Sequence, residues 1–356
     1  MTTPTVYLDP LSRAFADAAA NQPPLESLTV EQFRAEVDLL QQHEPLPGVT
    51  RTEFTVPFED GVTTYIFKPD GYRGDLPVVF VFHGGAWIGG NVDSHDSICR
   101  DIALQTGFAV VFPEYTLAPE ARYPTQQEQC YAVVKWVKKH GSTKGLSEDL
   151  FAIVGDSAGG QLTTAVTILA STRKPTINIA YQVLISPVTD TVTTDRDTPS
   201  EYRFFNGPFL TVPFLRKCID AYIPNPDDRT SELATARNIS AKNAAKQPPT
   251  LILNSSADLL RDDGVFYGEI LQKAGVDVAI MTSHGQLHDS VLFEAVRAGA
   301  TPRAALRLIA AQLKMALKET GEVKVAAKGR GKRLRDGLSE ENTDQPTKKD
   351  VRRRKR

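Results

Sequence analysis

Short apolar runs recur along most of the chain, and longer amphipathic segments separate them. Runs of this kind lie at residues 77–82, 108–112, 150–154, 180–185 and 250–253. A continuous apolar run favours a strand that is buried on both faces, because an exposed face would require alternating polar residues. Strands that alternate with helices predict a mostly parallel sheet that is covered by helices on both faces. The sequence therefore predicts an α/β fold.

The segments between these runs have the length and spacing of helices. We expect a last strand at 276–281 and helices at residues 96–106, 123–140, 159–171, 262–274 and 302–318. Two helices at 10–21 and 29–42 precede two strands at 51–57 and 63–68, and Thr29 and Gln32 have the spacing of a capping box. Residues 188–247 interrupt the alternation and are rich in Phe, Tyr and Pro, which indicates an insertion over the sheet.

The composition is that of a globular protein. Hydrophobic residues make up 41% of the 356 positions and charged residues 24%, which excludes wholesale disorder and fibrous repeats. Cys99, Cys130 and Cys218 are too few and too scattered for a disulfide framework or a structural zinc site. No apolar run is long enough to span a membrane, and the N-terminus lacks a basic patch followed by an apolar run. We therefore expect a cytoplasmic protein.

Charge is distributed unevenly along the chain. Residues 322–356 contain 13 Lys or Arg and 6 Asp or Glu, whereas the rest contains 28 and 37. Because this segment has no aromatic residue and no sustained apolar period, we expect a basic, disordered tail at 321–356. Basic clusters at 332–335 and 352–356 resemble a bipartite nuclear-import signal, which makes an import receptor a candidate partner and the nucleus a candidate location. Weak nucleic-acid contact and a merely solvated tail are the alternatives.

The pentapeptide Gly155-Asp156-Ser157-Ala158-Gly159 fits the pattern G-x-S-x-G. It follows an expected strand and precedes an expected helix, which is the context that the pattern requires. A tight strand-to-helix turn exposes the serine hydroxyl, and the small flanking residues let neighbouring backbone pass close by. The helix N-terminus beneath the turn favours negative charge. Ser157 is therefore the candidate nucleophile.

Consecutive glycines follow the expected strand at 77–82, in the segment His83-Gly84-Gly85-Ala86-Trp87. Glycines at this place let backbone N–H groups point into a cleft, where they can bind the oxyanion of a tetrahedral intermediate. An ordinary glycine turn is the alternative, and the serine turn about 70 residues later argues against it.

Taken together, these motifs resemble those of the α/β-hydrolase fold, and specifically of the hormone-sensitive-lipase-like esterases. The resemblance extends from about residue 45 to 318. Five segments that occur in the family's order carry it: 83–87 (HGGG-type loop), 114–124 (DYRLAPE-like), 155–160 (GDSAGG), 257–264 (ADPLRDEG-like) and 285–289 (GxxHDF-like). The chain departs from the family pattern at Ala86, Thr116 and Ser290, none of which is a triad position.

The resemblance implies a catalytic triad of Ser157, Asp258 and His288. The histidine would take the serine proton and later deliver it to the leaving alcohol, and Asp258 would fix its tautomer. The N–H groups of Gly84, Gly85 and Ala158 would form the oxyanion hole, and no metal or cofactor would be needed. Asp262 and Asp263 are alternative acids, and His284 is an alternative base.

In the family, the N-terminal helices and an inserted segment form a lid. The corresponding segments here are residues 1–45 and about 188–247, which leaves 46–320 as the hydrolase domain. An apolar lid over a serine favours an apolar acyl group or a bulky hydrophobic alcohol. The candidate substrate-binding residues are Trp87, Phe204, Phe205 and Phe209, although these phenylalanines could simply pack the lid.

The expected activity is that of a serine carboxylesterase acting on short- to medium-chain or bulky hydrophobic esters. A deacetylase or lactonase of secondary metabolism is a narrower form of the same activity. The alternative is a non-catalytic small-molecule receptor on the same fold, like the plant gibberellin receptors, which have lost the histidine. An interaction protein that acts through its tail is a third possibility. A homodimer is compatible with the resemblance, because some relatives dimerise.

Overall fold

A single eight-stranded sheet forms the centre of the protein. The computed structural model describes residues 6–192 and 210–340. The strand order is β1-β2-β4-β3-β5-β6-β7-β8. The pairs β1·β2 and β2·β4 are antiparallel, and all later pairs are parallel, which confirms the predicted mostly parallel sheet. The strands are β1 (Val49–Val56), β2 (Val62–Pro69), β3 (Leu76–Phe82), β4 (Ala109–Pro113), β5 (Leu146–Asp156), β6 (Tyr181–Ile185), β7 (Thr250–Ala257) and β8 (Val278–Leu287).

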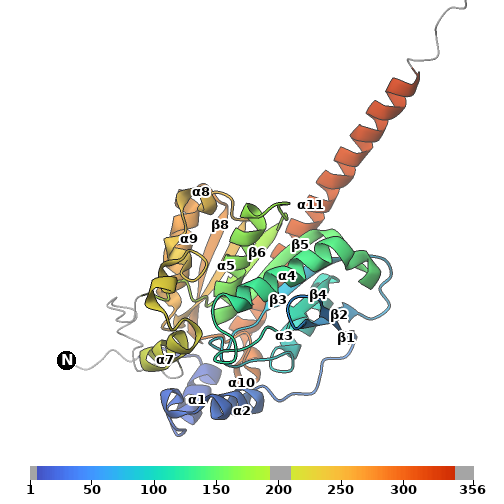
Figure 1. The fold of residues 1–356 in the computed structure, drawn as a ribbon. Coiled ribbons are helices and arrows are strands. Elements are labelled where there is room, and N and C mark those ends of the chain that lie inside the picture. The colour runs from blue at the N-terminus through green and yellow to red at the C-terminus, as the bar shows by residue number, and fades with distance from the viewer. Residues whose placement is uncertain (1–5, 193–209, 341–356) are drawn as a thin grey trace, which may run out of the picture. The chain divides into compact units, whose positions relative to one another are not determined.

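Helices cover both faces of this sheet (Figure 1). One face packs against α4 (Thr125–His140), α5 (Ser157–Thr172) and α9 (Arg261–Lys273), and the other against α3 (Asp96–Thr106) and the first part of α11 (Ala300–Glu340). The two faces alternate along each buried strand. In β3, Val78, Phe80 and Phe82 belong to the first core, and Val79 and Val81 belong to the second. Such a strand needs apolar residues at every position, which explains the continuous runs in the sequence.

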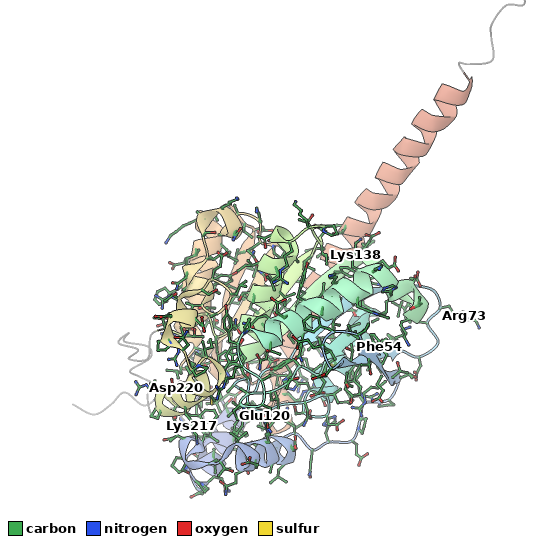
Figure 2. All side chains as sticks on the ribbon, in the orientation of Figure 1. Phe54, Arg73, Glu120, Lys138, Lys217 and Asp220 are labelled. Carbon is green, nitrogen blue, oxygen red and sulfur yellow. The ribbon has the colours of Figure 1, made fainter. Side chains whose placement is uncertain are left out.

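The N-terminal helices and the insertion form a cap. It comprises α1 (Pro10–Ala19), η1 (Leu25–Ser27), α2 (Val30–Leu40) and α7 (Val212–Tyr222), which gather at one end of the sheet (Figure 1). The Lys217 ammonium, labelled in Figure 2, donates hydrogen bonds to the carbonyls of Glu26 (3.0 Å) and Leu28 (2.6 Å). Phe33 of α2 also contacts Phe214 of α7, with ring centroids 5.0 Å apart. The two lid segments predicted from the family therefore contact each other.

Shorter elements complete the description. They are η2 (Gly141–Lys144), η3 (Pro226–Thr230), η4 (Ala236–Asn238), α8 (Ala241–Ala244) and α10 (Glu294–Arg297). The predicted capping box is confirmed at the start of α2, where the side chains and backbone N–H groups of Thr29 and Gln32 bond reciprocally.

The last helix is longer than the sequence predicted. It continues to Glu340, whereas we expected it to end at residue 318 and the chain to lack structure from 321. The expectation of disorder is therefore wrong for residues 321–340. The segment holds three Lys and three Arg, which are good helix formers, and no proline before Pro346, whereas its four glycines disfavour a helix. Extending an existing helix is far easier than starting one. Chain contacts place residues up to Leu317 in one compact unit and the later residues in a second. Residues 341–356 lie outside the described part.

Candidate active site

Ser157 lies at the sharp turn between β5 and α5. The strand ends at Asp156, and the helix begins at Ser157 itself, whose φ of 51° is in the left-handed region. A Cβ atom on Gly159 would overlap the carbonyl oxygen of Phe82 in the neighbouring strand. The turn can therefore pack against β3 only with glycine at this position. This is the strained strand-to-helix turn that the G-x-S-x-G pattern predicted.

The structure brings Ser157, His288 and Asp258 together from the ends of three strands. His288 Nε2 lies 2.9 Å from Ser157 Oγ, and His288 Nδ1 lies 2.8 Å from Asp258 Oδ2. Asp258 directly follows β7, and His288 directly follows β8. Parallel strands end at the same edge of the sheet, so residues far apart in sequence meet there.

The alternative acids and base have other contacts. The Asp263 carboxylate accepts hydrogen bonds from the backbone N–H groups of Thr189 (2.8 Å) and Asp190 (3.0 Å). Asp262 pairs with Arg261, at 3.0 Å. His284 stacks on Tyr7, with ring centroids 4.9 Å apart. Within the described residues, only His288 therefore contacts Ser157 Oγ as a base would.

The surroundings of His288 favour its protonated form. Burial by itself lowers the pKa of His288, but the nearby carboxylates of Asp258 and Asp289 outweigh burial and hold the pKa well above its usual value. Such an imidazolium is the form that a general base reaches after it takes a proton.

The loop after β3 shows that Gly84 was wrongly predicted as an oxyanion donor. Its N–H donates to Asp156 Oδ2 at 2.9 Å and is therefore already used. In the described part of the chain, the N–H groups of Gly85 and Ala86 have no hydrogen-bond acceptor. Ala158 is the second residue of α5, where an N–H has no acceptor inside the helix. The free donors are thus those of Gly85, Ala86 and Ala158. The sequence could not show which of several successive N–H groups points inward, because that depends on φ, which is 103° at Gly85 and 55° at Ala86.

Two buried residues that the sequence did not assign to the site fix this loop. The Asp156 carboxylate binds Gly84 and lies 3.4 Å from His95 Nε2, and His95 Nδ1 lies 2.9 Å from Ser94 Oγ. Burial lowers the pKa of His95, but the Asp156 carboxylate outweighs burial and raises it. His95 lies at the N-cap of α3, yet its side chain makes no capping hydrogen bond. Its role is to hold Asp156 instead.

The structure places Trp87 in the core, whereas we predicted that it lines the substrate pocket. Its side chain is fully buried, its Nε1–H donates to Gln161 Oε1 at 3.1 Å, and its ring stacks on Tyr222 with centroids 4.6 Å apart. A large indole gains most from full burial when its N–H also finds a partner. Trp87 therefore anchors the oxyanion loop to α5 and α7. The other predicted substrate residues, Phe204, Phe205 and Phe209, lie outside the described residues.

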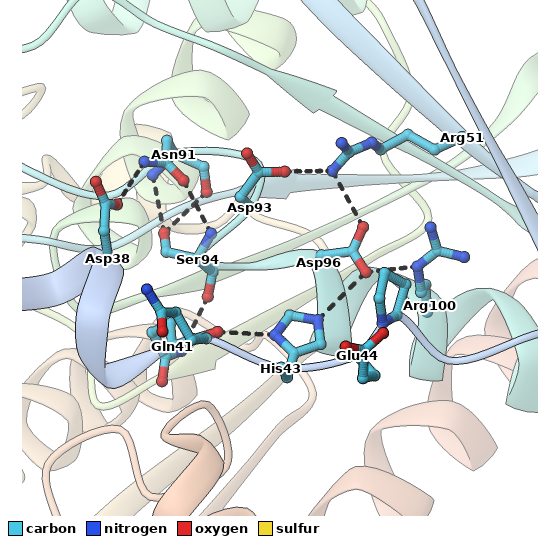
Figure 3. Close-up of a pocket in the computed structure, with 12 residues that line it drawn as sticks. Asp38, Gln41, His43, Glu44, Arg51, Asn91, Asp93, Ser94, Asp96 and Arg100 are labelled. Atoms are coloured by element: carbon cyan, nitrogen blue, oxygen red, sulfur yellow. Dashed lines mark hydrogen bonds and ion pairs between the residues drawn. The ribbon is translucent and has the colours of Figure 1, made fainter.

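Two cavities lie beside the cap. One is polar and measures about 790 Å³ (Figure 3). There the Asp96 carboxylate contacts Arg100 Nε (2.5 Å), Arg51 (3.2 Å) and His43 Nε2 (3.4 Å). Arg100 also donates to the carbonyls of Leu46 and Val49. These charges neutralise one another and bind the connection between α2 and β1 to α3, so we assign them a structural role.

The second cavity is apolar and measures about 680 Å³. It is enclosed mainly by α1, η1 and α2, and its lining includes Phe15, Leu25, Leu28 and Leu40. Phe15 packs in the same small core as Ala257 and Leu287, the residues directly before Asp258 and His288. Phe15 therefore links the apolar cavity to the small core that contains these two residues.

The sheet order and the site geometry are those of an α/β-hydrolase, and comparisons with known proteins agree. Residues 79–292 match a family described by the alpha/beta hydrolase fold. An esterase of Gibberella moniliformis is 35% identical, and the match covers 87% of this chain and 98% of that protein. A carboxylesterase of Mycobacterium tuberculosis is 31% identical, and the match covers 83% of this chain and 93% of that protein. The crystal structure of carboxyl esterase 2 from Tuber melanosporum matches with a TM-score of 0.80 at 33% identity, over 87% and 99%.

The chain belongs to the α/β-hydrolase family, in its hormone-sensitive-lipase-like branch, and it is a carboxylic ester hydrolase. The family and the class of enzyme predicted from the sequence motifs are thus confirmed. Among the described residues, no helix combines the length and the apolar content that crossing a bilayer requires.

Proposed function

We propose that this protein hydrolyses carboxylic esters through an acyl-enzyme intermediate on Ser157. The observation that carries the proposal is the continuous contact from Ser157 Oγ to His288 and on to Asp258. As Ser157 Oγ attacks the ester carbonyl carbon, its proton moves to His288 Nε2. The same proton then passes to the oxygen of the leaving alcohol, and a water molecule hydrolyses the acyl-enzyme by the same route.

The N–H groups of Gly85, Ala86 and Ala158 would bind the negative charge that develops on the carbonyl oxygen. All three belong to the two turns that meet between β3 and β5. The N-terminus of α5 adds its positive dipole at the same place. Each donor of this kind is worth about 3 kcal/mol of transition-state stabilisation. Asp156 and His95 support the donors without contacting the substrate.

We infer that the substrate carries a hydrophobic group, of short to medium chain length or bulky. The apolar cavity of about 680 Å³ that the N-terminal helices enclose supports this, because an apolar cavity of this size suits such a group. A deacetylase or lactonase activity would use the same machinery on a narrower substrate. The complete Ser157–His288–Asp258 contact favours catalysis over the alternative of a receptor without turnover.

Hydrolysis of p-nitrophenyl esters from acetate to palmitate tests the proposal, with Ser157→Ala beside the parent protein. We expect turnover in the parent, loss of turnover in Ser157→Ala, and labelling of Ser157 by a fluorophosphonate. A parent protein that neither turns over these esters nor reacts with the fluorophosphonate would refute the proposal and favour the receptor. Labelling without turnover would indicate a competent nucleophile with a narrower substrate.

We also propose that the basic tail acts as a nuclear-import signal. Its support is the sequence alone, in the clusters at 332–335 and 352–356. A fluorescent fusion of the full chain should enter nuclei, and replacement of the basic residues of both clusters by alanine should abolish entry. Equal distribution of the two fusions would refute this proposal, and a salt-sensitive association with nucleic acid would support the alternative.

A further inference from the structure

A second carboxylate lies at the catalytic histidine, on the side of the nucleophile. Asp289 Oδ2 is 3.1 Å from His288 Nε2, the nitrogen that also contacts Ser157 Oγ at 2.9 Å. Asp258 occupies the other nitrogen, Nδ1. Ser157 and Asp289 therefore compete for one position on the imidazole ring.

The backbone around Asp289 is held by hydrogen bonds. Its φ of 51° lies in the left-handed region, which aspartate and asparagine tolerate better than most residues. Its carbonyl accepts hydrogen bonds from the N–H groups of Leu292 (2.8 Å) and Phe293 (3.4 Å). The residue is only 6% exposed, and its Oδ1 has no hydrogen-bond partner among the described residues. The described polar contact of this carboxylate is thus the one with His288.

The contact favours one protonation state of His288. In the neutral imidazole with a proton on Nδ1, the Nε2 lone pair accepts the Ser157 hydroxyl proton, and an Asp289 carboxylate would face that lone pair unfavourably. In the imidazolium, the Nε2–H can donate to Asp289 Oδ2, and the opposite charges attract. Asp289 therefore stabilises the form of His288 that cannot accept a proton from Ser157.

The other ionisable groups around the pair do not reverse this preference. Asp258 at Nδ1 also stabilises the imidazolium, and Asp156 adds a further negative charge near Asp289. His95 lies close enough to interact with both Asp156 and Asp289. Burial raises the pKa of Asp289, whereas the charge of His288 opposes this shift. The two residues therefore gain and lose protons as a pair.

We propose that Asp289 binds the Nε2–H of protonated His288 in competition with Ser157, and thereby sets the pH above which Ser157 can be activated. Asp289 is thus a positioning residue that acts through His288. The proposal rests on the proposed function, because it assumes that His288 is the base for Ser157. At acidic pH, the free enzyme should therefore hydrolyse esters more slowly than a serine esterase whose histidine has a single carboxylate partner.

The pH dependence of kcat/KM for p-nitrophenyl butyrate tests this, together with the rate of Ser157 labelling by a fluorophosphonate over pH 5–9. The pH dependence of kcat/KM and that of the labelling rate both report the protonation state of the free enzyme. Asp289→Asn keeps the shape and the tolerance of positive φ but removes the charge. We expect the acid limb of the kcat/KM profile of Asp289→Asn to lie about one pH unit lower than that of the parent. Below the midpoint of the parent's acid limb, this shift is a roughly tenfold gain in relative activity. Asp277→Asn, a matched loss of one carboxylate at the surface, should leave the limb unmoved.

An unchanged acid limb in Asp289→Asn would overturn the proposal, as would an equal shift in Asp277→Asn. Asp289→Gly, which also removes the carboxylate and suits positive φ, replaces Asp289→Asn if the latter does not fold. The parent enzyme gives a separate test, because an acid midpoint at or below about 6.5, the value of an ordinary histidine, would contradict the proposal. Retention of hydrolysis and labelling in Ser157→Ala would instead refute the proposed function, so the two failures are distinguishable.

Discussion

Replacement of Gly84 by alanine should lower the kcat of ester hydrolysis by about 10²–10³-fold, although the Gly84 N–H faces away from the substrate. A Cβ atom at this position would overlap Asp156 Oδ2. It would also lie 3.0 Å from the carbonyl oxygen of Asp156 and 3.1 Å from Ser157 Cβ. The last two atoms belong to the turn that carries the nucleophile and have little freedom to move. The loop that holds Gly85 and Ala86 must therefore shift.

The expected loss is set by two contributions. Rotation of the Asp156 carboxylate would relieve one overlap but would break its hydrogen bond from Gly84 N–H, and a bond to a charged group contributes about 1.5–3 kcal/mol. A displaced loop would also misalign the donors at Gly85 and Ala86, and loss of one such donor costs about 2.7–4 kcal/mol in the transition state. The second contribution acts mainly on kcat, because the oxyanion exists only during reaction.

Steady-state kinetics on p-nitrophenyl butyrate would separate the two constants. We expect a large fall in kcat with a KM that changes less than about threefold, since the misaligned donors act on a charge that exists only in the transition state. Gly275→Ala is a control away from the site, in the turn between α9 and β8: a Cβ there meets no atom within 4 Å, and its φ of 84° strains the backbone, so we expect lower stability but an unchanged kcat. A folded Gly84→Ala enzyme with a kcat within threefold of the parent would refute the assignment of this loop.

Three further predictions concern the cap, a buried histidine and the apolar cavity. Arg34 donates to the carbonyls of Ile88 and Ala118 and pairs with Glu120, so Arg34→Ala should lower the free energy of unfolding by about 1–3 kcal/mol. Glu120→Ala should cost less than about 1 kcal/mol, because the pair is exposed; urea denaturation that showed equal losses would contradict this. Burial lowers the pKa of His83 to about 3. His83 therefore binds a proton near pH 6.5 in the unfolded chain but only near pH 3 in the folded protein. As the pH falls from about 6.5 towards 3, His83 should lower the free energy of unfolding by up to about 1.4 kcal/mol per pH unit. His83→Asn should reduce this slope in denaturation curves measured between pH 7 and 4, and an unchanged slope would disprove the assignment. Ala19→Phe should narrow the apolar cavity and lower kcat/KM for p-nitrophenyl octanoate more than for the acetate; an equal change for both esters would show that the cavity does not hold the substrate.

Local pattern determined the class of fold. The apolar runs of β3, β4 and β5 predict strands that are buried on both faces, because side chains alternate and both faces pack against helices. The turn at Ser157 was predicted from five consecutive residues, since strand, tight turn and helix are local features. The positions of Asp258 and His288 followed from the family's motifs and their order, and the geometry places His288 against Ser157 and Asp258 against His288, as those motifs imply.

Long-range geometry decided the remainder. Whether Gly84, Gly85 or Ala86 has a free N–H depends on the φ values of the loop and on Asp156, which lies 72 residues further along the chain. Burial of Trp87 against Tyr222 joins two segments that no local pattern connects.

The second carboxylate at His288 shows the same limit. Asp289 is next to His288 in sequence, but its side chain reaches Nε2 from a backbone with a φ of 51°, which the spacing of residues does not specify. The sequence by itself determined which residue types and which secondary structures this protein has, because those depend on local spacing. The tertiary structure decided which donors are free and which charges meet, because these depend on contacts between residues that are far apart in the chain or on backbone conformations that spacing does not specify.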